Sequence, residues 1–151
     1  MKTVSFLASG RGSNFYRVAQ AIMGQSIAGA RAGLLVTSNK NAGALDRAQE
    51  LGFFSRALSV KEEGGKAAFE RRVVSILLEH DTDLLVCAGY MKILSADFIR
   101  EFSRPIMNIH PALVPAFPGL HAQKQALEYG VKVSGCTVHF VDEGVDTGPI
   151  I

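Results

Sequence analysis

The sequence has few cysteines and no long apolar run. Cys87 and Cys136 both lie within apolar segments, and neither belongs to a Cys-x-x-Cys or Cys/His ligand pattern. We therefore expect two buried thiols in a reducing compartment and no structural metal site. No apolar stretch is long enough to span a bilayer. The strand-like segment 3–8 is also too short for a signal peptide, so we expect a cytoplasmic protein that does not bind membranes.

Charge is sparse and nearly balanced. The net charge is +2, and no run of basic residues is longer than Arg71-Arg72. This pattern argues against nucleic acid or a membrane surface as a partner and is compatible with anionic small molecules. The 151 residues suffice for one globular domain. Because the sequence stops in the apolar segment 149–151, we expect residues 1–151 to be a single domain whose C-terminal part is missing.

Strand-like and helix-like segments alternate along the chain. Short apolar runs predict strands, and apolar residues at helical spacing predict helices. Strands are expected over 3–8, 32–37, 54–58, 83–88, 106–109 and 134–141, with another starting at 149. Helices are expected over 15–23, 42–51, 66–80, 96–102 and 122–129. This order favours an α/β fold, with a doubly wound, mostly parallel sheet and helices on both of its faces.

A glycine-rich loop, residues 9–14 (SGRGSN), joins the first expected strand to the first helix. In α/β proteins the free N–H groups at such a helix N-terminus bind phosphate. The loop is not a dinucleotide fingerprint, because Phe15 occupies the third glycine position. It is not a P-loop either, because no Gly-Lys-Ser/Thr follows. A single phosphate, such as a ribose phosphate, fits best, and a turn that only reverses the chain is the alternative.

An amide and an imidazole lie two residues apart at the end of a later strand. Residues i and i+2 of a strand face the same side, so Asn108 and His110 should share one space. An amide donor beside a group that titrates near neutrality suits acyl transfer, and a purely structural histidine is the alternative. Of the other histidines, His80 is expected at the surface and His139 as a packed or hydrogen-bonded strand residue. His121 could either line a site or be exposed.

An acidic turn, residues 142–149 (DEGVDTGP), follows the last long strand. One of its carboxylates could orient an imidazole or hold it charged. The alternative is a solvated turn between strands. The spacing does not fit an EF-hand calcium loop.

Five motifs, taken in order, resemble those of the phosphoribosylglycinamide formyltransferases, the folate-dependent enzymes of purine synthesis. The resemblance implies formyl transfer from 10-formyltetrahydrofolate, a co-substrate, to the amine of glycinamide ribonucleotide, with no metal. It implies that Asn108 stabilises the oxyanion, that His110 acts as acid and electrostatic stabiliser, and that Asp146 supports His110 and helps relay the proton. A monomer or a homodimer is expected. The motifs are residues 9–14, 89–94, 108–111, 117–121 and 138–149.

The same resemblance implies two sets of binding residues. Lys66 and Lys92 stand where this family often has arginine. The ribose phosphate would contact Gly12, Ser13, Asn14, Phe15 and Tyr16. The folate would contact Lys66, Met91, Lys92, Ile93, Leu94, Asn108, Val141, Asp142 and Asp146.

Three other functions are alternatives to this one. A formyltetrahydrofolate deformylase would hydrolyse the same donor, but it normally carries a regulatory domain ahead of the glycine loop. A methionyl-tRNA formyltransferase would need an RNA-binding extension and a basic surface, and neither is visible. A non-catalytic nucleotide-binding module would require the amide, imidazole and carboxylate motifs to be coincidental.

Overall fold

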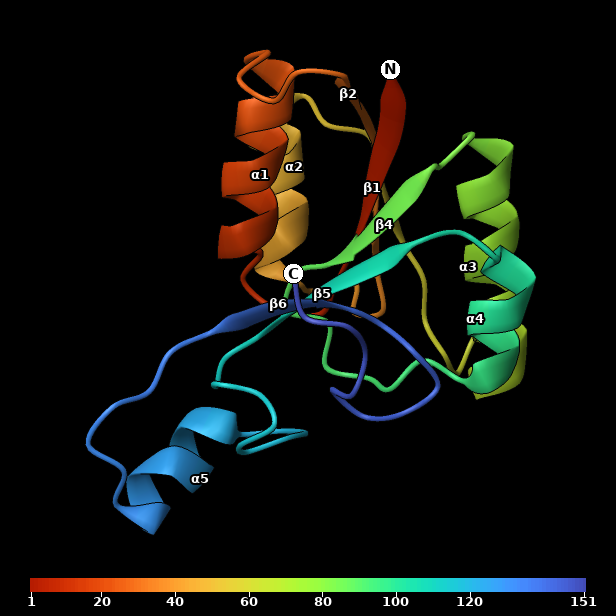
Figure 1. The fold of residues 1–151 in the computed structure, drawn as a ribbon. Helices are drawn as coiled ribbons and strands as arrows, with labels where there is room; N and C mark the ends of the chain where they lie inside the picture. The colour runs from red at the N-terminus through yellow and green to blue at the C-terminus, as the bar shows by residue number, and fades with distance from the viewer.

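Six strands form one sheet in the order β3-β2-β1-β4-β5-β6 (Figure 1). The computed structural model describes residues 1–151. The first five strands are parallel and β6 runs antiparallel to β5. This arrangement confirms the predicted doubly wound, mostly parallel sheet. The strands are β1 (Lys2–Ala8), β2 (Ala30–Thr37), β3 (Ser55–Ala57), β4 (Leu84–Cys87), β5 (Ile106–His110) and β6 (Thr137–Phe140).

Helices cover both faces of the sheet. Figure 1 shows α1 and α2 on one face, α3 and α4 on the other, and α5 apart from the sheet beyond β5 and β6. From β1 the sheet is extended first on one side, by β2 and β3, and then on the other side, by β4, β5 and β6. In α/β sheets, ligands usually bind in the crevice at the carboxyl ends of the strands where this change of side occurs, here between β1 and β4. The helices are α1 (Ser13–Met23), α2 (Gly43–Leu51), α3 (Lys66–Glu79), α4 (Ala96–Phe102) and α5 (Ala122–Tyr129).

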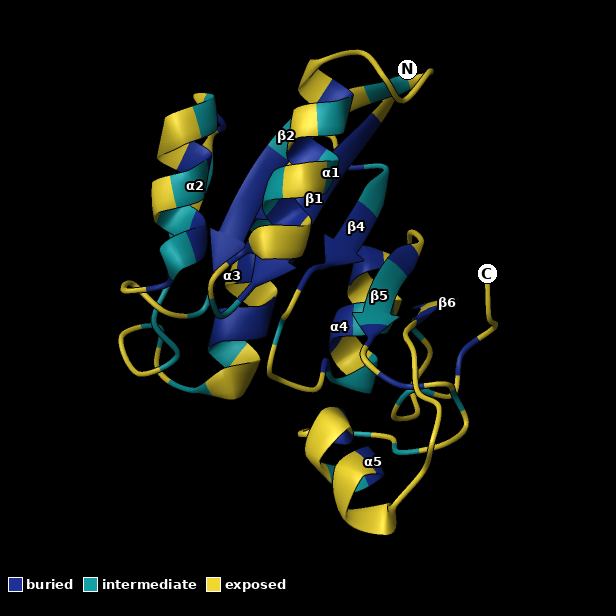
Figure 2. Cartoon of the chain, turned by 90° about the vertical axis from the view of Figure 1, so that its left-hand side faces the viewer, coloured by how far each residue is buried: buried dark blue, intermediate teal, exposed yellow.

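Two apolar clusters, one on each face, hold the layers together. Under α1 and α2, the rings of Phe6, Phe15 and Phe53 meet edge to face at centroid distances of 5.1–5.8 Å. Under α3 and α4, Phe69 and Phe102 are buried against the other face. Figure 2 shows the central strands as the most buried part of the chain and α5 as largely exposed. The central sheet is therefore a rigid base for the loops at its carboxyl edge.

Four local predictions needed correction. Helix α1 begins at Ser13, two residues earlier than expected, because Gly12 adopts a left-handed conformation and ends the loop. Strand β6 is shorter than the predicted 134–141, and residues 131–136 form an exposed segment. Cys136 is therefore exposed, whereas Cys87 is buried as expected. The strand expected from residue 149 is a single bridge between Ile150 and His139.

Candidate active site

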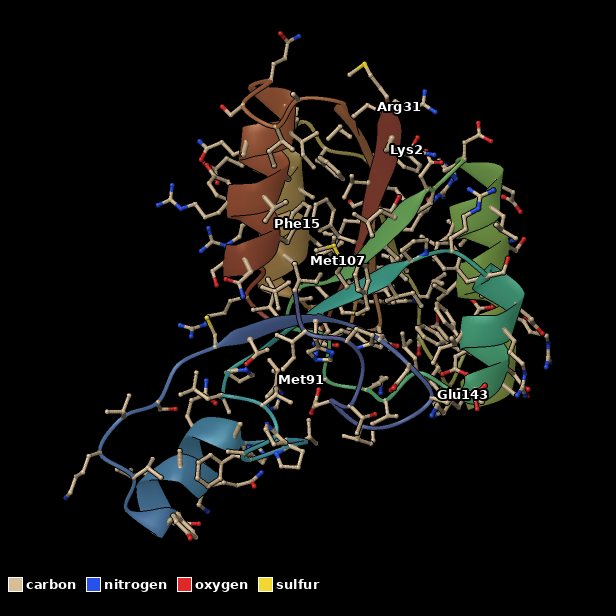
Figure 3. All side chains as sticks on the ribbon, viewed as in Figure 1. Lys2, Phe15, Arg31, Met91, Met107 and Glu143 are labelled. Atoms are coloured by element: carbon tan, nitrogen blue, oxygen red, sulfur yellow. The ribbon has the colours of Figure 1, made fainter.

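A cavity of about 870 Å³ opens at the carboxyl edge of the sheet, where the chain order reverses. In Figure 3, Lys2 and Arg31 mark the amino ends of β1 and β2, and Met91 lies at the opposite end, toward α5. The cavity brings together most of the predicted site residues. Those that line it are Gly12, Ser13, Asn14, Lys66, Met91, Lys92, Ile93, Leu94, Asn108, His110, Val141, Asp142 and Asp146.

The glycine-rich loop is held against the first turn of α2. The N–H of Ala44 donates to the carbonyl oxygen of Gly10 at 3.1 Å. Gly12 has a φ of +72°, and a Cβ there would lie 2.6 Å from Cβ of Ala44, so only glycine fits. The first N–H groups of α1, which have no partner within the helix, follow this glycine. Free N–H groups at a helix N-terminus are able to hold an anion.

Two of the predicted phosphate contacts do not reach the cavity with their side chains. Phe15, labelled beside α1 in Figure 3, is fully buried. Its ring packs against those of Phe6 and Phe53. The hydroxyl of Tyr16 donates to Glu50 at 2.8 Å on the surface. Neither residue lines the cavity. If these two residues contact phosphate, we expect them to do so through their backbone N–H groups.

Asn108, His110 and Asp146 meet at one point. The Oδ2 atom of Asp146 lies 3.3 Å from Nδ1 of His110, and its Oδ1 atom lies 3.4 Å from Nδ2 of Asn108. The side chain of Asp146 is only 11% exposed and that of His110 only 4%, so water screens this contact weakly. The expectation that Asn108 and His110 face the same space is confirmed. The acidic turn supplies the carboxylate that lies between them.

The turn that carries Asp146 is closed by its own hydrogen bonds. Oδ1 of Asp142 accepts from the hydroxyl of Thr147 at 2.7 Å and from the N–H of Gly144 at 3.0 Å. The bond from Thr147 is the main reason why the pKa of Asp142 is lowered. Asp146 itself has a φ of +54°, and its Oδ2 accepts from the N–H of Gly119 at 2.8 Å. The carboxylate thus also ties the proline-rich loop, residues 111–121, to the site.

His139 belongs to the same cluster. It is 2% exposed, and its Nε2 lies 3.3 Å from Nδ2 of Asn108 and 3.4 Å from Oδ1 of Asp146. The prediction of a packed, hydrogen-bonded residue is confirmed, but its place in the site was missed. The signal that reveals it is the pairing of β6 with β5, which sets His139 directly opposite Asn108.

The other end of the cavity is apolar and formed by the loop after β4. Met91 and Ile93 are 61% and 58% exposed, although both are hydrophobic. The N–H of Met91 donates to Oγ of Ser9 at 3.1 Å, which joins this loop to the glycine-rich loop. Lys66 lines the cavity from the start of α3, with its Nζ 3.8 Å from Glu70. A cavity with an exposed apolar surface and a lysine in its lining suits a flat, partly anionic ligand.

Two further properties of the chain concern metals and membranes. No group of three or more His, Cys, Asp and Glu side chains is arranged to hold a metal ion. None of the helices combines the length and the apolar character needed to cross a bilayer.

The chain belongs to the formyl transferase family, which it matches over residues 1–151. It is 42% identical to phosphoribosylglycinamide formyltransferase of Bacillus subtilis, across 100% of the chain and 77% of that protein. It is 47% identical to the trifunctional purine biosynthetic protein adenosine-3 of Drosophila melanogaster, of which it spans 11%. The fold superposes on glycinamide ribonucleotide transformylase 1 of Symbiobacterium toebii with a TM-score of 0.95 and 39% identity, covering 100% of the chain and 71% of that structure.

Proposed function

We propose that this protein transfers the formyl group of 10-formyltetrahydrofolate to the amine of glycinamide ribonucleotide in purine biosynthesis. The observation that carries the proposal is the meeting of Asn108, His110 and Asp146 between two differently built ends of one cavity. Membership of the formyl transferase family and the names of the relatives support it.

The two ends of the cavity suit the two substrates. The free N–H groups at the start of α1, with Ser13 and Asn14, would hold the phosphate of the ribonucleotide. The apolar loop carrying Met91 and Ile93 would hold the folate rings, and Lys66 would face the anionic tail of the folate. The catalytic cluster lies where the amine of one substrate would meet the formyl carbon of the other.

The reaction needs positioning, an oxyanion partner and a route for a proton. The neutral amine would attack the formyl carbon, so that a new C–N bond forms and the carbonyl oxygen becomes an oxyanion. When the carbonyl re-forms, the bond between the formyl carbon and the folate nitrogen breaks, and the folate leaves. The amide of Asn108 would donate to that oxyanion, and His110 would stabilise the same charge. Asp146 would help move the proton lost by the amine to the departing folate nitrogen. Because the amine is itself the nucleophile, no covalent enzyme intermediate is required.

The test is to incubate the intact protein with 10-formyltetrahydrofolate, with and without glycinamide ribonucleotide, and to measure how fast the 10-formyltetrahydrofolate is consumed. We expect loss only when the ribonucleotide is present, with formyl-glycinamide ribonucleotide formed in equal amount. Equal loss without acceptor would instead identify a deformylase. No consumption under either condition, with the ribonucleotide bound, would favour a non-catalytic module.

We further propose that the protein works in a reducing compartment, the cytoplasm. Both of its cysteines are free, and neither forms a disulfide. Free thiols, one of them exposed, are typical of proteins kept in a reducing environment.

A further inference from the structure

His139 lies behind the proposed oxyanion donor and has no part in the mechanism above. It sits on β6, directly opposite Asn108 on β5, and is almost fully buried. Its Nδ1 lies 2.8 Å from the carbonyl oxygen of Phe140, and its Nε2 lies 3.3 Å from Nδ2 of Asn108. Each ring nitrogen therefore has a specific partner.

These partners define where the hydrogen of the ring lies. A carbonyl oxygen only accepts hydrogen bonds, so Nδ1 of His139 must carry a hydrogen toward Phe140. In the neutral ring, Nε2 then carries a lone pair and no hydrogen, so it can only accept a hydrogen bond. The amide of Asn108 meets that lone pair with its NH₂ end. A reversed amide would set its carbonyl oxygen against the lone pair, so the ring dictates the orientation of the amide.

We propose that His139 is a positioning residue for formyl transfer, in which its Nε2 holds one amide hydrogen of Asn108 and leaves the other for the oxyanion. The remaining acceptor near Nδ2 is Oδ1 of Asp146, and at 3.4 Å that contact is long. The second hydrogen is thus weakly held and free to meet a developing negative charge. This inference rests on the proposed function, because it gives Asn108 a substrate on which to act.

One carboxylate lies against the same ring, and a second lies near enough to affect it electrostatically; both oppose this state. Oδ1 of Asp146 lies 3.4 Å from Nε2 of His139, and Asp142 also interacts electrostatically with the ring. A second hydrogen on the ring, at Nε2, would point to Asp146 and remove the acceptor for Asn108. The proposal therefore requires the neutral ring with its hydrogen on Nδ1 in the working enzyme.

The state of the ring is measured directly by NMR of the intact protein labelled with ¹⁵N-histidine. We expect a protonated Nδ1 and an unprotonated Nε2 for His139 at the pH of activity. The Nε2 resonance should shift in Asn108→Ala, while Nδ1 should stay in place. A hydrogen found on Nε2 would overturn the proposal whether or not the protein transfers formyl groups, so the two failures are distinguishable.

A double-mutant cycle tests whether His139 acts through Asn108. Loss of one hydrogen-bond anchor in His139→Leu should lower kcat about five- to tenfold, with KM unchanged. The same change in an Asn108→Ala background should cause no further fall, because the group to be positioned is gone. His139→Gln, which keeps an acceptor, should restore part of kcat. Equal losses in both backgrounds, or a raised KM alone, would reduce His139 to a structural residue.

A matched control separates positioning from loss of stability. Thr82 is also fully buried, and its hydroxyl is 2.8 Å from that of Ser5, before the amino end of β4. Thr82→Val should lower the melting temperature and leave kcat unchanged. If it lowered kcat as much as His139→Leu does, the effect at position 139 would be explained by destabilisation and the proposal would fall.

Discussion

The Nε2 atom of His110 lies 2.8 Å from the carbonyl oxygen of Phe117, in the proline-rich loop. Its Nδ1 faces Oδ2 of Asp146 at 3.3 Å. Both nitrogens of this buried ring thus face oxygen atoms, and a ring with a hydrogen on each satisfies both of them. The charged ring is the form that best stabilises an oxyanion. In the proposed reaction, Nε2 would have to leave the Phe117 carbonyl in order to reach the oxyanion.

Replacing His110 by alanine tests the proposed role of its imidazole. We expect His110→Ala to lower kcat by about two orders of magnitude, the usual share of a positioned acid or base, while thermal unfolding remains cooperative. Steady-state kinetics with both substrates would measure this. His80→Ala is the control, because His80 stacks on Phe54 at the far end of α3 and does not line the cavity. Near-normal turnover in His110→Ala would remove the ring from the mechanism.

The carboxylate of Asp146 can be neutralised with little change in shape. In Asp146→Asn the amide oxygen can still accept from the N–H of Gly119, but the negative charge beside His110 is lost. We expect kcat to fall about 100-fold or more and the melting temperature to change little. Glu143→Gln serves as the comparison, since this exposed acid of the same turn pairs only with Arg100. Similar rates for both variants would contradict a role for Asp146.

Two glycines of the same loop should respond differently to an added methyl group. Gly12→Ala places a Cβ 2.6 Å from Cβ of Ala44 at a φ of +72°, so we expect a loss of about 1–3 kcal/mol in the free energy of unfolding. The displaced loop should also raise KM for the ribonucleotide. At Gly10 a Cβ meets nothing within 4 Å, so Gly10→Ala should leave stability almost unchanged. Denaturant unfolding of the two variants compares them, and equal stabilities would refute the steric account.

Cys87 and Cys136 should differ sharply in how fast they react with an alkylating reagent. Burial raises the pKa of the Cys87 thiol to about 12, so its reactive thiolate is absent at neutral pH and it should react only after unfolding. Cys136 is exposed and lines the cavity, so it should react in the native protein and more slowly with substrates bound. Mass spectrometry after iodoacetamide treatment would show this, and rapid native labelling of Cys87 would contradict the buried position.

The raised pKa of Cys87 predicts how the stability of the protein changes at alkaline pH. The pKa of Cys87 is raised from 9.0 in the folded state, so the unfolded chain loses this proton first as the pH rises. Its contribution to stability is therefore complete below pH 9 and is lost as the pH increases toward 12. Cys87→Ala should consequently show a weaker loss of stability between neutral and alkaline pH than the parent protein, measured by unfolding at several pH values.

Much of the fold was predictable because its signals are local. Apolar runs identified the five parallel strands, and the bounds of α4 and α5 were predicted to the residue. The antiparallel direction of β6 was not predicted, because it depends on a contact with β5 that no local pattern encodes. The burial of Cys136 was wrongly predicted for a related reason. The predicted strand 134–141 includes Cys136, but β6 begins only at Thr137, and the segment before it is exposed.

The candidate site was predictable where alternation or sequence motifs indicated it. Asn108 and His110 share a face because they alternate on one strand, and the acidic turn supplied Asp146. Phe15 was assigned to phosphate, although it also begins the apolar stripe of α1, and packing against Phe6 determines where its ring lies. His139 was missed because its role depends on a partner 31 residues away.

The antiparallel pairing of β5 with β6 has one more consequence. Along β6, Thr137 and His139 are buried while Val138 and Phe140 are more exposed. A slip of one residue would turn the imidazole to the solvent and place a hydrophobic side chain opposite Asn108. Such a molecule would keep its helices and most of its sheet, yet its chemistry would be gone. The register of β6 on β5 is therefore as necessary for the site as the identity of its residues.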